Sequence, residues 1–153
     1  MRPRGGLSWL DPGAFGTLGV GGGFALGAKL CRPQSDVWLI WGDGSAGYSI
    51  AEFDTFLRHK VPIVAVIGND ACWTQILREQ EPILGDDVAC QLSYTEYDVV
   101  AKGYGGEGYN VRDINKVKGV LEQALKVSRE KGIPVCVNAL IGSTDFREGS
   151  ISV

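Results

Sequence analysis

Oxygen-bearing side chains follow two apolar runs of the sequence at the point where each run ends. Asp43 comes after the run at 37–41, and Asn69 comes after the run at 63–67, with a helix-length segment between them. Because the carboxyl ends of neighbouring parallel strands meet at one edge of a sheet, we expect the two side chains to lie close together. Carboxylate and amide oxygens are ligands that Mg²⁺ prefers, and the glycines beside Asp43 would let a phosphate approach the backbone. The spacing therefore predicts a site for a magnesium-bound diphosphate.

The ligand shell of such a cation can be assigned from the same residues. Mg²⁺ takes near-octahedral oxygen ligands and few protein carboxylates. Diphosphate oxygens, the Asp43 carboxylate, the Asn69 amide oxygen, a water and one backbone carbonyl would complete it, and Ala71 lies in the right turn to give that carbonyl. The N–H groups of Gly44 and Ser45 would face the phosphates. Each motif alone is more typical of an ordinary turn, and it is their position on successive strand ends that favours the site.

The elements that position these residues alternate between strand-like and helix-like patterns. Apolar runs predict strands at 37–41, 63–67 and 133–141 and a short edge strand at 109–111. Helical spacing predicts helices at 19–30, 48–60, 73–80 and 94–102, and one that Asp113 caps and that ends at Lys131-Gly132. The alternation predicts an α/β fold, doubly wound, with a mainly parallel sheet and helices on both faces.

Two local details refine this prediction. The almost unbroken apolar character of 37–41 predicts a strand buried on both faces of the sheet. Pro82 is expected to stop the helix at 73–80 before it. Residues 1–18 and 83–93 are expected to be irregular, and residues 142–153 form a polar tail.

Composition limits the classes of partner. The 153 residues most simply form one domain, and their net charge of −3 gives no long-range attraction for nucleic acid or an anionic membrane. No run of about 18 apolar residues is present, so we expect no membrane segment in this chain. The 22 glycines are roughly twice the average share and cluster at the ends of apolar runs, which indicates tight turns and close ligand approach. Four cysteines without a CxxC pair and a single histidine exclude an ordinary zinc constellation.

Other phosphate motifs fit less well. The segment from Gly27 to Leu30 lacks the Gly-Lys-Ser/Thr ending of a P-loop. The glycine run at 19–23 leaves open a Rossmann-type nucleotide-binding oxidoreductase, although no strand is expected before it. No Gly-x-Ser-x-Gly elbow is present, and the lone His59 leaves few general-base options for a hydrolase.

The motif Gly42-Asp43-Gly44-Ser45, with Asn69-Asp70 on the next strand end, resembles the cofactor motif of thiamine-diphosphate-dependent enzymes. The segment Gly16-Thr17-Leu18-Gly19 is similar to the one that precedes this motif in the family. The resemblance covers residues 1–153 as a carboxy-terminal, thiamine-diphosphate-binding domain. Flanking segments resemble the acetolactate synthase-like branch of the family, which includes 2-hydroxyacyl-CoA lyases; they lie at 8–13, 73–80 and 144–150.

The resemblance implies roles for individual residues. Asp43, Asn69 and the Ala71 carbonyl would bind Mg²⁺, and Gly44 and Ser45 would hold the diphosphate. On the other side of the cofactor, the Gly16 carbonyl would meet the aminopyrimidine amine and Leu18 would bend the cofactor. The remaining implied cofactor contacts are Thr17, Gly42, Cys72 and Trp73. Gly68 stands where relatives often have a first asparagine, which leaves Asn69 as the amide of the motif.

The resemblance also implies what the chain does as a whole. Its cofactors would be thiamine diphosphate and Mg²⁺, and its activity carbon–carbon cleavage or formation on a 2-hydroxyacyl-CoA or on a 2-oxo acid such as pyruvate. Family enzymes form homodimers or larger homo-oligomers and activate the cofactor with a glutamate on an amino-terminal domain. These 153 residues contain no such domain, so we expect negligible turnover from this chain alone, as a fragment, a partial gene model or a non-catalytic short isoform retaining cofactor or dimer contacts. Relatives of this branch sit at the endoplasmic reticulum membrane, and the location of this chain stays open.

Overall fold

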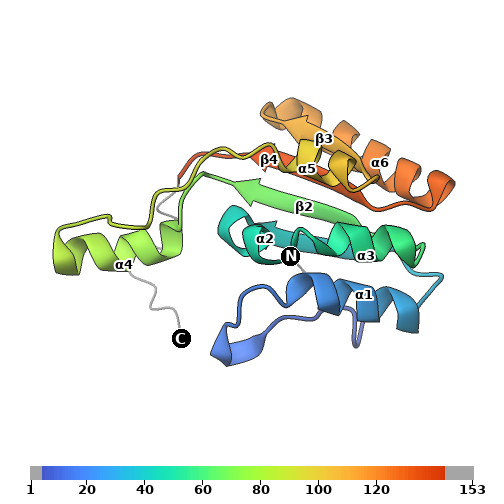
Figure 1. Ribbon diagram of the computed structural model, residues 1–153, viewed down its shortest axis with the longest axis horizontal. Helices are drawn as coiled ribbons and strands as arrows, with labels where there is room; N and C mark the ends of the chain where they lie inside the picture. The colour runs from blue at the N-terminus through green and yellow to red at the C-terminus, as the bar shows by residue number, and fades with distance from the viewer. Residues whose placement is uncertain (1–4, 144–153) are drawn as a thin grey trace.

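The computed structural model describes residues 5–143, which form a parallel four-stranded sheet with helices on both faces (Figure 1). The strand order is β1-β2-β4-β3, and every neighbouring pair is parallel. The α/β fold with a parallel sheet is therefore confirmed, and β3 is an edge strand as predicted. The strands are β1 (Trp38–Gly42), β2 (Val64–Asn69), β3 (Glu107–Val111) and β4 (Val135–Leu140).

The helices follow the predicted order, with one difference around the motif. The helix predicted at 48–60 is two helices, and the first begins at Asp43, directly after β1. The prediction was wrong there because the glycines at 42–47 argue for a loop, whereas the complete burial of Ala46 against the sheet holds this segment helical. The helices are α1 (Gly21–Cys31), α2 (Asp43–Ser49), α3 (Glu52–Arg58), α4 (Thr74–Leu84), α5 (Tyr97–Gly103) and α6 (Ile114–Lys131), preceded by the 3₁₀ turn η1 (Gly13–Phe15).

The ends of α6 are as predicted. The Asp113 side chain accepts a hydrogen bond from the Asn115 N–H at 3.0 Å, which satisfies one free donor of the first turn. Gly132 ends the helix with a positive φ of 66°, a conformation that glycine adopts without the steric cost of a Cβ.

The core consists of two clusters, one on each face of the sheet. On one face α1, α2, α3 and α5 cover the sheet, and the side chains of Phe53, Phe56 and Ile67 there are fully buried. On the other face α6 packs against β3 and β4, where Val135 and Val137 are buried. This double cover fits the continuous apolar character of the two central strands.

Strand β1 is not buried on both faces, so that prediction was wrong. It lies at the edge of the sheet, and its residues alternate between exposed and buried. Trp38 and Ile40 are 38% and 48% exposed, because α6 covers the other end of this face. An apolar run shows only that a strand is able to be buried. Whether both of its faces are covered depends on its place in the strand order, which cannot be read from the run itself.

Pro82 does not end α4, which continues to Leu84 and closes at Gly85 with a φ of 68°. Proline removes one hydrogen bond of the helix, and α4 buries none of its residues, so a local adjustment disturbs no packing. Figure 1 shows α4 extending away from the sheet. None of the helices in residues 5–143 combines the length and apolar character needed to cross a bilayer. The segment resembling the family at 144–150, and most of the polar tail at 142–153, lie outside the described residues.

Candidate functional site

The carboxyl ends of β1 and β2 lie side by side. The parallel register pairs Gly42 with Gly68, so Asp43 and Asn69 occupy the same step at the end of adjacent strands. The chain then turns in both places, into α2 after Asp43 and into the loop before α4 after Asn69. The structure thus brings the two predicted ligands to one edge of the sheet, as their spacing predicted.

The Asp43 carboxylate is buried, with 3% of the residue exposed, and it is only partly satisfied. Its Oδ1 accepts a hydrogen bond from the Gly44 N–H at 2.9 Å, whereas its Oδ2 accepts none from the described residues. Burial raises the pKa of this carboxyl above its ordinary value, and the charge of Asp70 raises it further, against the lowering effect of the Gly44, Ala71 and Cys72 amides. A buried carboxylate oxygen without a donor is unfavourable unless a cation or another donor completes it.

Asn69 is fully buried and every polar atom of its amide is engaged. Its Nδ2 donates to the Thr95 carbonyl at 3.1 Å and to Asn138 Oδ1 at 3.2 Å. Its Oδ1 accepts from the Ala71 N–H at 3.2 Å. An amide oxygen has two lone pairs, so Oδ1 retains one for a further ligand.

Ala71 has a left-handed backbone, with a φ of +56°. This conformation is uncommon for a residue with a Cβ and indicates that the surrounding turn imposes it. The Ala71 carbonyl, the predicted third protein ligand, accepts a hydrogen bond from the Leu92 N–H at 2.8 Å. Its second lone pair is the one that a cation would use.

Trp73 lies directly over the start of α2. A Cβ added to Gly44 would fall 2.5 Å from the Trp73 ring, so only glycine permits this contact. The same ring lies 6.3 Å from the Tyr48 ring, at a tilt of 58°. Trp73 therefore contacts the segment that the sequence assigned to a diphosphate, and Cys72 beside it is buried.

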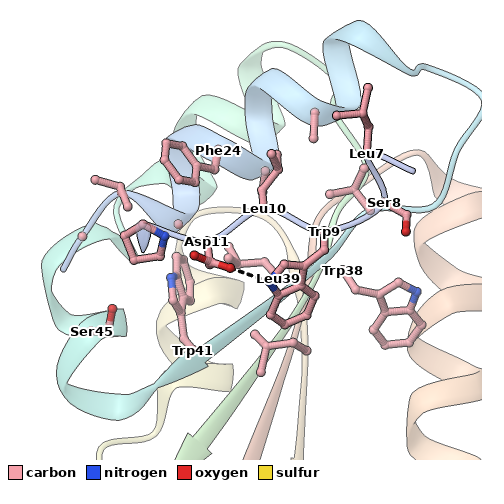
Figure 2. Close-up of a pocket in the computed structure, with 18 of the residues that line it drawn as sticks. Leu7, Ser8, Trp9, Leu10, Asp11, Phe24, Trp38, Leu39, Trp41 and Ser45 are labelled. Atoms are coloured by element: carbon pink, nitrogen blue, oxygen red, sulfur yellow. Dashed lines mark hydrogen bonds between the residues drawn. The ribbon is translucent and has the colours of Figure 1, made fainter. Parts of the chain in front are cut away.

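The other predicted contacts lie in the loop before α1. Gly16 has a φ of 63°, which turns the chain after η1. Thr17 and Leu18 line a cavity of about 490 Å³ that also reaches Ser45. Figure 2 shows its walls, which come from the segment at 7–12 on one side and from β1, including Trp41, on the other. One largely apolar space is thus bordered by Thr17 and Leu18 and by Ser45 of α2.

The glycine run at 19–23 serves packing. A Cβ at Gly21 would lie 2.4 Å from Nε1 of Trp41, and one at Gly22 would lie 2.8 Å from Cγ of Glu52. These glycines therefore let α1 approach β1 and α3 closely. The segment before them, from residue 5 onward, contains no strand, so the strand–turn–helix context of a dinucleotide fingerprint is missing.

A group of buried polar side chains behind Asn69 was not predicted from the sequence. Asn138 on β4 and Asp98 on α5 hydrogen-bond to the same amide network, and the Tyr97 hydroxyl donates to the Asp43 carbonyl at 3.0 Å. Asn138 carried a signal, since it is a polar residue inside an apolar run at 133–141. Nothing in residues 5–143 groups three or more His, Cys, Asp or Glu side chains as a metal site, so a cation bound by the Asp43 carboxylate would depend on amide, carbonyl and diphosphate oxygens for its other ligands.

Comparison with known proteins shows that the chain is similar to a domain of enzymes that share the same cofactor. The sequence profile described as "Thiamine pyrophosphate enzyme, C-terminal TPP binding domain" matches residues 1–139. A 2-hydroxyacyl-CoA lyase 2 from Danio rerio is 64% identical over the whole of this chain and 25% of its own length, and the Homo sapiens protein of that name is 60% identical over the whole of this chain and 24% of its own. The acetolactate synthase large subunit of Mycobacterium tuberculosis is 43% identical over 86% of this chain and 24% of its own length.

A solved structure agrees with the sequence relatives. The thiamine diphosphate-dependent 4-hydroxybenzoylformate decarboxylase of Rhodococcus jostii superposes with a TM-score of 0.73 at 26% identity, over 86% of this chain and 24% of that one. The chain therefore spans about a quarter of the length of the relatives it matches.

Proposed function

We propose that this chain, which belongs to the thiamine pyrophosphate enzymes as their carboxy-terminal cofactor-binding domain, binds its cofactor together with Mg²⁺. Thiamine pyrophosphate and thiamine diphosphate are two names for this cofactor. We further propose that the reaction it serves is carbon–carbon cleavage of a 2-hydroxyacyl-CoA. Relatives named for that lyase are 51–64% identical to this chain, against 43% for the acetolactate synthases. Synthesis of an acetolactate-type product from a 2-oxo acid is the second candidate.

The observation that carries the Mg²⁺ proposal is the buried Oδ2 of Asp43, which accepts no hydrogen bond from the part of the chain that the structure describes. Three candidate ligand oxygens lie at these two strand ends: this carboxylate oxygen, Oδ1 of Asn69 with one lone pair left, and the Ala71 carbonyl. All three are hard ligands of the type that Mg²⁺ prefers, and two of them are neutral. The residues present therefore fit a divalent cation that diphosphate oxygens would complete.

The chain's own residues would divide the work around the cofactor. Asp43, Asn69 and Ala71 would hold the cation, and the N–H groups of Gly44 and Ser45 would face the diphosphate. Leu18, half exposed at the cavity, would shape the opposite end. When bound, thiamine diphosphate supplies the nucleophilic carbon for cleaving or forming a carbon–carbon bond.

Association between copies is also proposed. The exposed apolar side chains of Trp38 and Ile40 on the edge strand β1 provide surface that a partner could cover. Sedimentation velocity would measure this, and a chain that stays monomeric at all concentrations tested would contradict it.

Calorimetric titration of the 153-residue chain with thiamine diphosphate tests the proposed function. We expect binding with Mg²⁺ present, much weaker binding in EDTA, and no Mg²⁺-dependent binding by Asp43→Ala. Titration with NAD is the matched control and should give no heat of binding. Equal affinity for thiamine diphosphate with and without Mg²⁺ would contradict the role proposed for Asp43.

A further inference from the structure

Behind the proposed cation ligands lies a connected series of buried polar side chains. It runs from Asn69 at the end of β2 to Asn138 on β4 and to Asp98 on α5. Both asparagines are fully buried, and Asp98 is 7% exposed. Polar groups in a core are costly unless each is hydrogen-bonded, so a satisfied network in this position indicates a specific role.

The first link decides which way the Asn69 amide faces. Its Nδ2 has two protons, and they are given to the Thr95 carbonyl and to Asn138 Oδ1, which are both acceptors. The reversed amide would place Oδ1 against these two acceptor oxygens and leave the Ala71 N–H facing a nitrogen that cannot accept. The Asn69 oxygen is therefore held toward the Ala71 turn.

The second link decides which way Asn138 faces. Its Nδ2 donates to the Thr95 carbonyl at 3.0 Å and to Asp98 Oδ1 at 3.4 Å. The Thr95 carbonyl and Asp98 Oδ1 both accept from this nitrogen, so together they turn the Asn138 oxygen toward Asn69. Asn110 donates to the same Asp98 oxygen at 3.5 Å, from the side away from Asn69.

We propose that Asn138, oriented by Asp98, is a positioning residue for the cation: through the amide of Asn69 it turns a carbonyl oxygen, rather than an N–H group, toward the cation site. This inference rests on the proposed Mg²⁺-dependent binding. In this proposal Asp98, by accepting a hydrogen bond from Asn138 Nδ2, helps to decide which way both asparagine amides face. Residues that orient metal ligands in this way typically change metal affinity about ten- to a hundredfold when they are replaced.

The first experiment measures the Mg²⁺ concentration that half-saturates thiamine diphosphate binding by the 153-residue chain. In Asn138→Leu, which keeps the size of the side chain and the charge of the protein, we expect this concentration to rise about ten- to a hundredfold. The affinity for thiamine diphosphate in EDTA should stay unchanged, which separates the cation from the rest of the site.

The matched control is Ser128→Ala. Ser128 is as buried as the network, and its hydroxyl donates to the Ile133 carbonyl at 3.0 Å, outside the series. We expect this variant to lower stability while its Mg²⁺ requirement stays within about twofold of the wild type. A wild-type Mg²⁺ requirement in Asn138→Leu, or a shift no larger than that of Ser128→Ala, would overturn the proposal.

The second experiment needs neither cation nor cofactor, so it remains decisive if the proposed function fails. In the free protein the Asn69 side-chain N–H protons should exchange slowly with solvent in an NMR exchange measurement, because both are engaged in the core. Exchange should become fast in Asn138→Leu, and in Asp98→Asn a second amide orientation should give a second set of Asn69 resonances. Slow exchange and a single set of resonances in both variants would mean that Asn138 and Asp98 do not orient Asn69.

Discussion

The carboxyl ends of β1 and β2, here the first and second loop of the candidate site, carry the proposed ligands Asp43 and Asn69 in opposite states. Asn69 is neutral and meets a hydrogen-bond partner at each polar atom, whereas Asp43 is buried with a carboxylate oxygen that finds no donor among residues 5–143. The first loop is thus electrostatically incomplete in the free protein, and the second is complete. The contrast fits the proposed division of tasks, in which Asn69 would supply a fixed direction and Asp43 would supply charge that a bound cation stabilises.

The largest effect is expected for Asp43→Ala, which should weaken Mg²⁺-dependent thiamine diphosphate binding by more than about a hundredfold. This exceeds the loss that is typical when a residue that only orients a metal ligand is replaced. Its free energy of unfolding without ligands should stay equal or rise, because an unsatisfied buried carboxylate is removed. Calorimetry and urea unfolding measure the two quantities. A clear loss of stability in the free protein would show that Asp43 is better satisfied than the structure indicates.

For Asn69→Ala we expect the free energy of unfolding to fall by about 2–6 kcal/mol, even without ligands. The change leaves Asn138 Oδ1 and the Ala71 N–H without their partner in a buried place, at a cost of about 1–3 kcal/mol for each such group. Urea unfolding of the free chain measures this loss. If Asn69→Ala and Asp43→Ala changed stability equally, the contrast between the two loops would be refuted.

Ala71→Gly should stabilise the free protein by up to about 1 kcal/mol. Its φ of +56° costs an L-residue energy that glycine avoids, and the greater freedom of glycine in the unfolded chain offsets part of the gain. The melting temperature is the measurement, and Ala46→Gly in the helical α2 is the control, which should be less stable than the wild type. Destabilisation by Ala71→Gly would argue against strain in the second loop.

The smallest effect is expected far from both loops, at the exposed ion pair of Arg129 and Asp36, whose Nε–Oδ1 distance is 2.8 Å. The hydrogen bond from Arg129 lowers the pKa of Asp36 below its ordinary value of 3.8. The pair should therefore stabilise the fold above that pH, and its contribution should vanish as the pH falls through the lowered pKa. Arg129→Met should cost under about 1 kcal/mol at pH 7 and progressively less as the pH falls below 3.8, as urea unfolding over that pH range would show.

The candidate site could be predicted from the sequence where its information is local. Asp43 and Asn69 each stand one glycine after an apolar run, so residue type and strand end could be identified together. The partnership of Asn69 with Asn138 could not, because the two residues are 69 positions apart and meet only through the pairing of β2 with β4. The exposure of Trp38 depends in the same way on the strand order.

Local propensity misled the prediction in two elements. The glycines after Asp43 argued for a loop, although burial of Ala46 makes the segment helical. Pro82 argued for a helix end, but α4 continues past it, because none of its residues is buried and a local adjustment at the proline disturbs no packing. In both elements tertiary packing decided the structure. Packing against the sheet holds α2 helical, and α4 has no buried residues whose packing a proline could disturb. A single sequence does not show which segments will be packed in this way.

The contact between Gly44 and Trp73 restricts how this chain can change over time. Any side chain at 44 would collide with the indole of Trp73, which follows Ala71 by two positions in the chain. Positions 44 and 73 therefore form a coupled pair, in which a larger residue at one is tolerated only after a smaller one has arisen at the other. Lineages that lose the tryptophan first are the ones free to abandon the glycine.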